Sequence, residues 1–342
     1  MDLSYALEQL QAISAIPSPT GMTDACADYV AGELTRLGFS PSRTRKGAVH
    51  CVVSEGPHPV VISGHIDTLG CVVRAVKPNG ALRYSKLGGW NDNAIENENV
   101  TIHCRSGKTF TGTVQSIHAS RHVWGDITAE NRTDQSLEIV LDEDVHTADE
   151  TAALGVRAGD LVSFDPRFTL TERGYVKCRF LDDKAAVALM LQLARDIAEG
   201  RLSPSRKVTL AFTIYEEIGH GASDLYGQDA EDFLAVDMGC VGDDLNGRET
   251  RVSICAKDAA GPYDWNLTNE LIARADRLGL DYAVDIYPGY SSDAATALKA
   301  GLDARFACLG PGVFASHGYE RTHVKGMEAT LMLLEDAVSG EV

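Results

Sequence analysis

The sequence predicts an α/β fold in which a mostly parallel sheet is sandwiched between helices and a small β-barrel-like domain is inserted. β-Branched and apolar runs of strand length alternate with helical repeats towards both ends of the chain. This alternation is typical of a parallel sheet covered on both faces. Between about residues 71 and 165 the pattern changes to short alternating segments separated by turns. We therefore expect a discontinuous main domain over residues 1–70 and 166–342, and an inserted β domain over 71–165.

Two helices and two strands are expected before the insertion. Apolar residues recur at helical spacing from residue 3 to residue 37, and Pro17 and Pro19 predict two helices in place of one. Gly38 is typical of a helix C-terminus. β-Branched runs at 49–54 and 60–63 predict strands, and the second run ends just before His65.

The inserted segment is predicted to be almost entirely β. Its alternating stretches are separated by turn signals such as Pro78-Asn79-Gly80 and Ser106-Gly107. The first strong helical repeat lies at 147–154. Strands are expected at 71–76, 100–104, 109–117 and 136–141.

The α/β pattern resumes at Val176. A strongly apolar helix is expected at 185–198, directly after an acidic pair. Apolar runs predict three more strands, and helical repeats predict three more helices. The strands are 208–214, 233–236 and 304–309, and the helices are 267–278, 292–300 and 327–337. A turn is expected at Gly310-Pro311-Gly312, after the last strand.

Composition excludes several classes of partner. The chain has 342 residues and a formal net charge of -18, and so acidic a surface repels nucleic acid and anionic lipid. No stretch approaches the ~20 continuous apolar residues of a membrane-spanning helix, and the first residues do not resemble a signal peptide. Eight cysteines at irregular positions are typical of free thiols in a reducing compartment. We therefore expect a cytoplasmic protein with neither nucleic-acid nor membrane partners.

Five patches of acid and imidazole carry the functional signal, and nearly every one follows an apolar run. Open α/β sheets bind ligands outside the carboxyl ends of their strands, so these patches are expected to meet there. Two histidines among several carboxylates form a hard-to-borderline metal site, for which Zn is the leading candidate. The patches are Gly64-His65-Ile66-Asp67, Leu181-Asp182-Asp183, Tyr215-Glu216-Glu217, Val236-Asp237 and Ser316-His317.

The first two patches each have a second interpretation. On an extended segment Asp67 points the same way as His65, so its carboxylate could orient a ligand imidazole, although both residues could equally cap a loop. Asp182-Asp183 stands where a helix N-cap is expected, a role that Asp favours and that is compatible with metal ligation.

The later patches differ in specificity. Adjacent acids such as Glu216 and Glu217 have no packing rationale after an apolar strand, because unpaired carboxylates are almost never fully buried. One of them could bind metal while the other acts as general base. Asp237 repeats the strand-then-acid pattern. His317 and His323 compete for the final ligand position, since both follow the expected turn.

Taken together, these patches resemble the tetrahedral (glutamyl, deblocking) aminopeptidases, a cytosolic branch of the dinuclear-zinc exopeptidases. The resemblance covers nearly the whole chain and includes Leu87-Gly88-Gly89-Trp90 and the run 154–160 within the insertion. It implies a zinc-exopeptidase-like fold and hydrolysis of N-terminal residues from short peptides. It also implies a homo-oligomer built from dimers through the inserted domain, up to a dodecamer.

Carried over residue by residue, the resemblance implies two divalent metal ions that share one carboxylate. His65, Asp182 and Asp237 would hold one ion, and Asp182 would bridge to the second. Glu217 and His317 would complete the second site. Two catalytic residues are implied as well: Asp67 would orient His65, and Glu216 would be the general base.

An ungapped match to the final family motif favours His317 over His323 as the last ligand and places Glu320 where the family has an acid. The chain also departs from the family. Lys184 replaces the usual Arg, and the segment 216–222 is one residue shorter than usual. The run 316–323 is similar to a subgroup linked to synthesis of a capped glutamine-dipeptide osmoprotectant, and that similarity weighs against ordinary aminopeptidase activity.

Two other functions remain open from the sequence. The same metal pair would serve an amidase or deacylase acting on an N-acylated or dipeptide-like small molecule. A non-catalytic metal- or peptide-binding protein would lack the base or a ligand, whereas Glu216 and all five proposed ligands are present. Carboxylate and imidazole also accept Co or Mn, so the native metal is left open, as is the preferred substrate side chain.

Overall fold

The computed structural model describes residues 2–126 and 128–340. The chain divides into two compact units, one formed by residues up to Asp67 and from Arg167 onwards, the other by Thr68–Pro166. Among the described residues no helix combines the length and apolar character that crossing a membrane would require.

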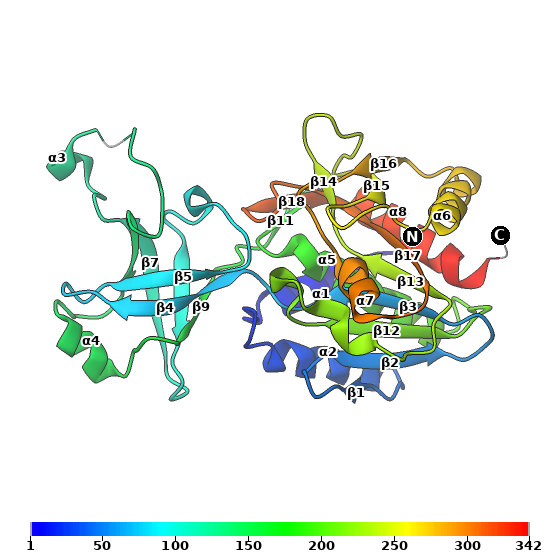
Figure 1. Cartoon of the computed structure of the whole chain (residues 1–342), viewed down its shortest axis with the longest axis horizontal. Helices are drawn as coiled ribbons and strands as arrows, with labels where there is room; N and C mark the ends of the chain where they lie inside the picture. The colour runs from blue at the N-terminus through cyan, green and yellow to red at the C-terminus, as the bar shows by residue number, and fades with distance from the viewer. Residues whose placement is uncertain (1, 127, 341–342) are drawn as a thin grey trace. The chain divides into compact units, whose positions relative to one another are not determined.

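Four parallel strands form the centre of the larger unit (Figure 1). They are β12 (Val208–Thr213), β3 (Val60–His65), β13 (Asp232–Val236) and β17 (Arg305–Phe314), in that order across the sheet. β12 and β3 pair in parallel, as do β3 with β13 and β13 with β17. Parallel neighbours place their carboxyl ends at one edge, and the segments that follow these strands therefore meet.

Further strands extend this sheet on both sides. β2 (Val49–Ser54) pairs antiparallel with β12, and β15 (Val252–Lys257) pairs antiparallel with β17. The remaining strands are β1 (Ser42–Arg43), β10 (Thr169–Leu170), β11 (Tyr175–Cys178), β14 (Gly239–Val241), β16 (Tyr282–Ile286) and β18 (Glu320–His323).

Helices cover both faces of the sheet, as the sequence predicted. Val60 and Ile62 of β3 join the core shared with α1 (Ser4–Ser14), α2 (Asp24–Arg36), α5 (Leu181–Ala198) and α8 (Val324–Ser339). Val61 faces the opposite core, which includes α7 (Asp293–Ala300) and the 3-10 turn η3 (Gly221–Leu225). α6 (Trp265–Leu278) contributes Leu267 and Leu271 to the first core.

The smaller unit is a closed antiparallel barrel with strand order β4-β5-β8-β7-β6-β9. A short helix, α4 (Ala148–Leu154), begins at Thr147 with a capping box completed by Glu150. Two further short elements are η1 (Asp92–Ala94) and α3 (Arg121–Trp124). The strands are β4 (Gly70–Val76), β5 (Leu82–Leu87), β6 (Asn99–His103), β7 (Thr109–Ser116), β8 (Leu137–Leu141) and β9 (Leu161–Phe164).

The turn expected at residues 310–312 is wrong, because β17 continues through it. Two glycines occur there because neighbouring backbone packs directly against the strand. A Cβ on Gly310 would lie 2.0 Å from the carbonyl oxygen of Asp237, and one on Gly312 would lie 2.1 Å from that of Arg248. Close approach of backbone is one of the positions that only glycine permits.

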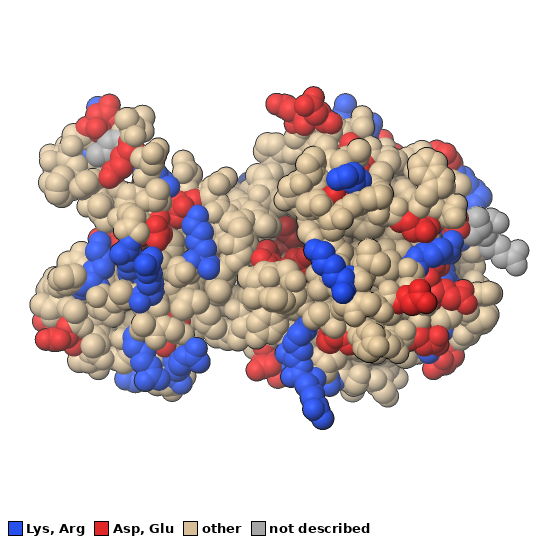
Figure 2. All heavy atoms as spheres, in the orientation of Figure 1, with Lys and Arg blue, Asp and Glu red and all other residues tan. Residues whose placement is uncertain are grey.

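On the one face drawn in Figure 2, charged side chains lie in small groups. On the face shown in Figure 2, Lys and Arg lie among Asp and Glu, and the described residues form no continuous basic surface there.

Candidate metal centre

Four of the predicted site residues lie at the carboxyl edge of the parallel strands. His65 is the last residue of β3, and Asp237 directly follows β13. Glu216 and Glu217 begin a 3-10 turn, η2 (Glu216–Ile218), shortly after β12. Strand register thus brings together residues that are up to 172 positions apart, from 65 to 237.

Asp182 and His317 reach the same place from other segments. Asp182 stands at the beginning of α5, where the backbone is not yet helical. Its N–H donates to Glu320 Oε2 at 3.0 Å, and the N–H of His317 donates to Glu320 Oε1 at 2.9 Å. The buried Glu320 carboxylate therefore ties these two segments to each other.

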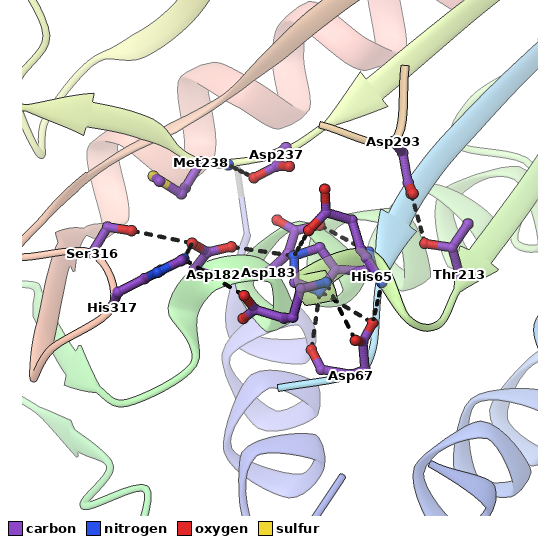
Figure 3. Close-up of polar contacts among 12 residues, drawn as sticks. His65, Asp67, Asp182, Asp183, Thr213, Asp237, Met238, Asp293, Ser316 and His317 are labelled. Carbon is purple, nitrogen blue, oxygen red and sulfur yellow. Dashed lines mark hydrogen bonds and ion pairs between the residues drawn. The ribbon is translucent and has the colours of Figure 1, made fainter. Parts of the chain in front are cut away.

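The Asp182 carboxylate lies between two imidazoles (Figure 3). Its Oδ1 is 3.2 Å from His65 Nε2, and its Oδ2 is 3.3 Å from His317 Nε2. Ser316 Oγ also donates to Oδ2, at 3.1 Å. Burial alone would raise the pKa of Asp182, but His317 and His65 outweigh burial and hold this pKa well below its usual range.

Two groups of metal-ligand atoms share Asp182. Side-chain ligand atoms of His65, Asp182 and Asp237 all lie within 4.8 Å of one another, and all three residues are buried. On the other side, Glu217 Oε2 lies 3.6 Å from His317 Nε2. Burial and the charge of Asp182 raise the pKa of Asp237 to about 7 and that of Glu217 well above its usual value.

Glu216 lies beside both groups and faces open space. Its Oε2 is 3.7 Å from His65 Nε2, and its side chain is 11% exposed. A cavity of about 800 Å³ is lined by Glu216 together with Asp182, Glu217, Asp237 and His317. A ligand of peptide size can therefore reach all of these side chains.

Asp67 acts through its backbone and its side chain separately. His65 Nδ1 lies 3.0 Å from the carbonyl oxygen of Asp67, whereas the nearest carboxylate oxygen is 3.7 Å away. The carboxylate instead accepts the N–H groups of Glu216 and Glu217, at 3.1 and 3.4 Å, and the hydroxyl of Thr20 at 2.7 Å. The carbonyl can hold His65 Nδ1 protonated, which leaves Nε2 free to face Asp182.

His323, the rival for the last ligand position, is not brought to this cluster. It ends β18 and caps α8, where its Nδ1 accepts the N–H of Lys325 at 3.0 Å. Its Nε2 lies 2.9 Å from the carbonyl oxygen of Arg173. Both ring nitrogens of His323 therefore have partners away from the acids.

Three residues support the site in ways that the sequence did not predict: Asp183, which belongs to a predicted acidic patch but was given no contact, and Asp293 and Lys46, which carried no distinctive signal. Asp183 Oδ2 accepts the N–H of His65 at 3.1 Å, and buried Asp293 accepts the hydroxyl of Thr213 at 2.6 Å. Lys46 Nζ donates to the carbonyl oxygens of His220 and Gly221 in the turn after the two glutamates. Asp293 follows an N-cap serine and looked like an ordinary helix start, so local sequence could not single it out.

The residues present fit divalent metal ions. The donors are imidazole nitrogens and carboxylate oxygens, and Glu217 Oε1 is buried with no hydrogen-bond partner among the described residues. Buried carboxylates without partners are costly, and a bound cation is one of the few groups that satisfies several at once. Such donors suit Zn, and also Co or Mn.

Imidazole and carboxylate donors at the carboxyl edge of a parallel α/β sheet define a metal-dependent hydrolase. The chain belongs to the M42 glutamyl aminopeptidase family, whose model matches residues 47–333. It is therefore an aminopeptidase, an enzyme that hydrolyses peptide bonds.

One relative is similar in sequence over nearly the whole chain, and two solved structures are similar in fold. The chain is 38% identical to the protein YhfE of Bacillus subtilis (strain 168) over 330 residues, which cover 96% of this chain and 95% of the relative. Its fold is similar to a TET aminopeptidase from the marine sediment archaeon Thaumarchaeota archaeon SCGC AB-539-E09, with a TM-score of 0.88, 15% identity and coverage of 98% and 97%. The TET1 peptidase of Pyrococcus horikoshii superposes with a TM-score of 0.85, 21% identity and coverage of 98% and 100%.

Proposed function

We propose that this chain is a two-metal aminopeptidase of short peptides in which Asp182 is shared by both ions. His65, Asp182 and Asp237 would hold one ion, and Asp182, Glu217 and His317 the other. The observation that carries this proposal is that the two oxygens of Asp182 face two different imidazoles, at 3.2 and 3.3 Å. A bridging carboxylate requires that arrangement, and Zn is the first candidate for both ions.

When bound, a metal pair activates water and polarises the peptide carbonyl. Glu216 is placed to take a proton from the attacking water, because its carboxylate lines the cavity beside the ligand cluster. A C–O bond forms at the carbonyl carbon, the C–N bond breaks, and Glu216 returns the proton to the departing amine. Glu216 thus acts first as general base and then as general acid.

Asp67 supports this reaction as a positioning residue. Its carbonyl oxygen favours the His65 tautomer with a free Nε2, and its carboxylate accepts the N–H groups of Glu216 and Glu217. The proposed base Glu216 and the proposed ligand Glu217 are therefore held by a residue two positions beyond the end of β3.

The function is tested by metal analysis of the purified protein together with two matched substrates, a short peptide with a free amine and its N-acetylated analogue. We expect about two metal ions per chain, hydrolysis of the free-amine peptide, and loss of hydrolysis on chelation. Cleavage of only the acetylated peptide would favour the amidase or deacylase, and absence of metal after reconstitution would refute the ligand set.

We further propose a homo-oligomer assembled through the inserted barrel. The Pyrococcus horikoshii TET1 peptidase can assemble into a tetrahedron or a large octahedral shell. A similar fold over 98% of this chain supports the proposal that copies of this chain also associate, with dimers as the building block and a dodecamer as the largest expected form. Light scattering tests it, and a particle mass near the 36.7 kDa of one chain would contradict it.

A further inference from the structure

The cavity beside the proposed metal centre has an extended apolar wall. Its volume is about 800 Å³, and its lining includes apolar side chains as well as the acids of the centre. The wall offers contact to a long substrate side chain rather than to a small one. Its apolar part is built from Met238, Leu245, Ile286, Tyr287, Pro288 and Tyr290.

Two acids line the same cavity and have no partner among the residues that the structure describes. Asp243 and Asp244 are exposed, and neither forms a hydrogen bond or ion pair with any described residue. No Lys or Arg occurs among the described residues that line the cavity, and Arg248 of the same loop does not line it. The negative charge of Asp243 and Asp244 is therefore available to pair with a cationic group of a ligand.

A buried anchor holds these acids in place. Asp285, at β16, accepts the N–H groups of Asn246 and Gly247, each at 2.8 Å, and also the side-chain amide of Asn246 at 3.0 Å. Its side chain is buried. This carboxylate ties the loop that carries Asp243 and Asp244 to the strand that leads into Ile286, so the two parts of the wall keep a fixed geometry.

We propose that this cavity selects substrates whose N-terminal residue is lysine or another long basic residue, an inference that rests on the proposed aminopeptidase function. The aliphatic stem would pack on the apolar wall while the cation reaches Asp243 and Asp244. A glutamyl side chain would pack against the same wall. Its carboxylate would then face Asp243 and Asp244, and no basic residue among those described as lining the cavity would offset this repulsion. The preferred side chain is therefore basic, whereas the family description names a glutamyl, and hence acidic, side chain.

Binding tests the cavity independently of turnover. Isothermal titration of the zinc-loaded protein uses L-lysine, L-norleucine and L-glutamate. Lysine and norleucine share a four-carbon stem with and without the ammonium group, and glutamate carries the opposite charge on a shorter stem. We expect lysine to bind about three- to tenfold more tightly than norleucine, the effect of one or two partly exposed ion pairs, and glutamate to bind most weakly. The lysine advantage should shrink in 0.5 M salt, because exposed charges are screened.

Substitution identifies the residues responsible. The double variant D243N/D244N should remove most of the lysine-over-norleucine ratio, both in binding and in kcat/KM for the corresponding p-nitroanilides. The matched control D303N/E8Q removes two exposed acids that do not line the cavity and should keep that ratio. A retained ratio in D243N/D244N would overturn the assignment.

The results of binding and hydrolysis distinguish the proposed aminopeptidase function from the proposed preference for a basic side chain. Tight lysine binding without hydrolysis of any free-amine substrate would refute the aminopeptidase proposal and leave the cavity assignment standing. Hydrolysis with glutamate or norleucine preferred, or no binding of any of the three amino acids, would refute the basic-side-chain assignment.

Discussion

The carboxylate of Asp67 accepts the backbone N–H of Glu216, with 3.1 Å between Oδ1 and nitrogen. Asp67 is completely buried, and its second oxygen accepts from Glu217 and from Thr20. An ionised carboxylate can accept all three of these bonds, since it carries only acceptor sites. The turn that bears the proposed base is thus held by a residue just beyond the neighbouring parallel strand.

Replacement of Asp67 by Asn tests this support. The amide keeps the size of the side chain but presents N–H groups where an acceptor is needed, which leaves a buried donor unsatisfied. We expect the free energy of unfolding to fall by about 1–3 kcal/mol and metal affinity or kcat to fall about 10–100-fold. Thr20→Val removes only one donor and should cost less on both measures. Equal effects of the two variants in urea unfolding and kinetics would contradict the argument.

Glu216→Gln tests the base. Glutamine is nearly isosteric but cannot accept a proton at neutral pH, so kcat should fall by about 10²–10⁴-fold. Because Glu216 is not among the proposed ligands, the metal content should stay at about two ions per chain. Elemental analysis and kinetics on one preparation decide the matter: wild-type turnover would remove Glu216 from the mechanism, and metal loss would make it a ligand.

His317→Ala and His323→Ala form a matched pair. The first substitution removes a ring nitrogen that lies 3.3 Å from Asp182, so one of two metal ions should be lost. His323→Ala removes the cap of α8 and should lower the free energy of unfolding by about 0.5–2 kcal/mol while both ions remain. Metal titration followed by thermal unfolding distinguishes them, and the reverse pattern would restore His323 as the ligand.

The central strands could be predicted from sequence because each contains an apolar run, and the runs of β3, β12 and β13 are followed within three residues by a histidine or an acid. β15 and β16 were missed for a physical reason. β16 pairs only with β15 among the described strands, so it is half exposed, and β15 carries Ser253 and Lys257 among its apolar residues. Neither presents the continuous apolar run of a fully buried parallel strand.

The contacts that complete the site could not be derived in the same way. Glu320 joins His317 to Asp182, which lies 138 residues before Glu320, and the resemblance only marked an acid at Glu320 without assigning it a contact. The apolar cavity wall follows no motif, because it depends on how the loop after β14 lies against β16. The spacing of residues in the sequence identifies candidate metal ligands. The residues that hold these ligands in position depend on tertiary packing.

Gly310→Ala should be strongly destabilising, because the new Cβ would lie 2.0 Å from the Asp237 carbonyl oxygen. Backbone would have to move, at a cost of roughly 1–3 kcal/mol or more, and Asp237 would shift with it. Gly32→Ala is the control: it lies within α2, where nothing approaches the new Cβ, and helix propensity favours Ala by about 1 kcal/mol. Denaturant unfolding should therefore give changes of opposite sign, and a neutral Gly310→Ala would show that the packing is looser than described.

Glu335 on α8 makes stability depend on pH. Burial, then the adjacent Asp196 carboxylate, raises its pKa to about 7. A raised folded-state pKa stabilises the fold while the group is protonated, so this contribution is complete below about pH 4.5 and is lost as pH rises through about 7. Glu335→Gln removes the ionisation. Relative to the wild type, the variant should gain roughly 1 kcal/mol between pH 5.5 and pH 8.5, a figure reduced for solvent screening because the side chain is only partly buried.

Thermal unfolding at the two pH values measures this gain as a difference between proteins, which cancels every other titrating group. The expected change is about 1–2 °C in Tm for a chain of this size. Exposed Glu172→Gln provides the matched control, because it removes the same charge from a glutamate in solvent. If both variants shift Tm equally at pH 8.5, net charge explains the effect. If only Glu335→Gln does, the burial of Glu335 together with its repulsion by Asp196 is the source.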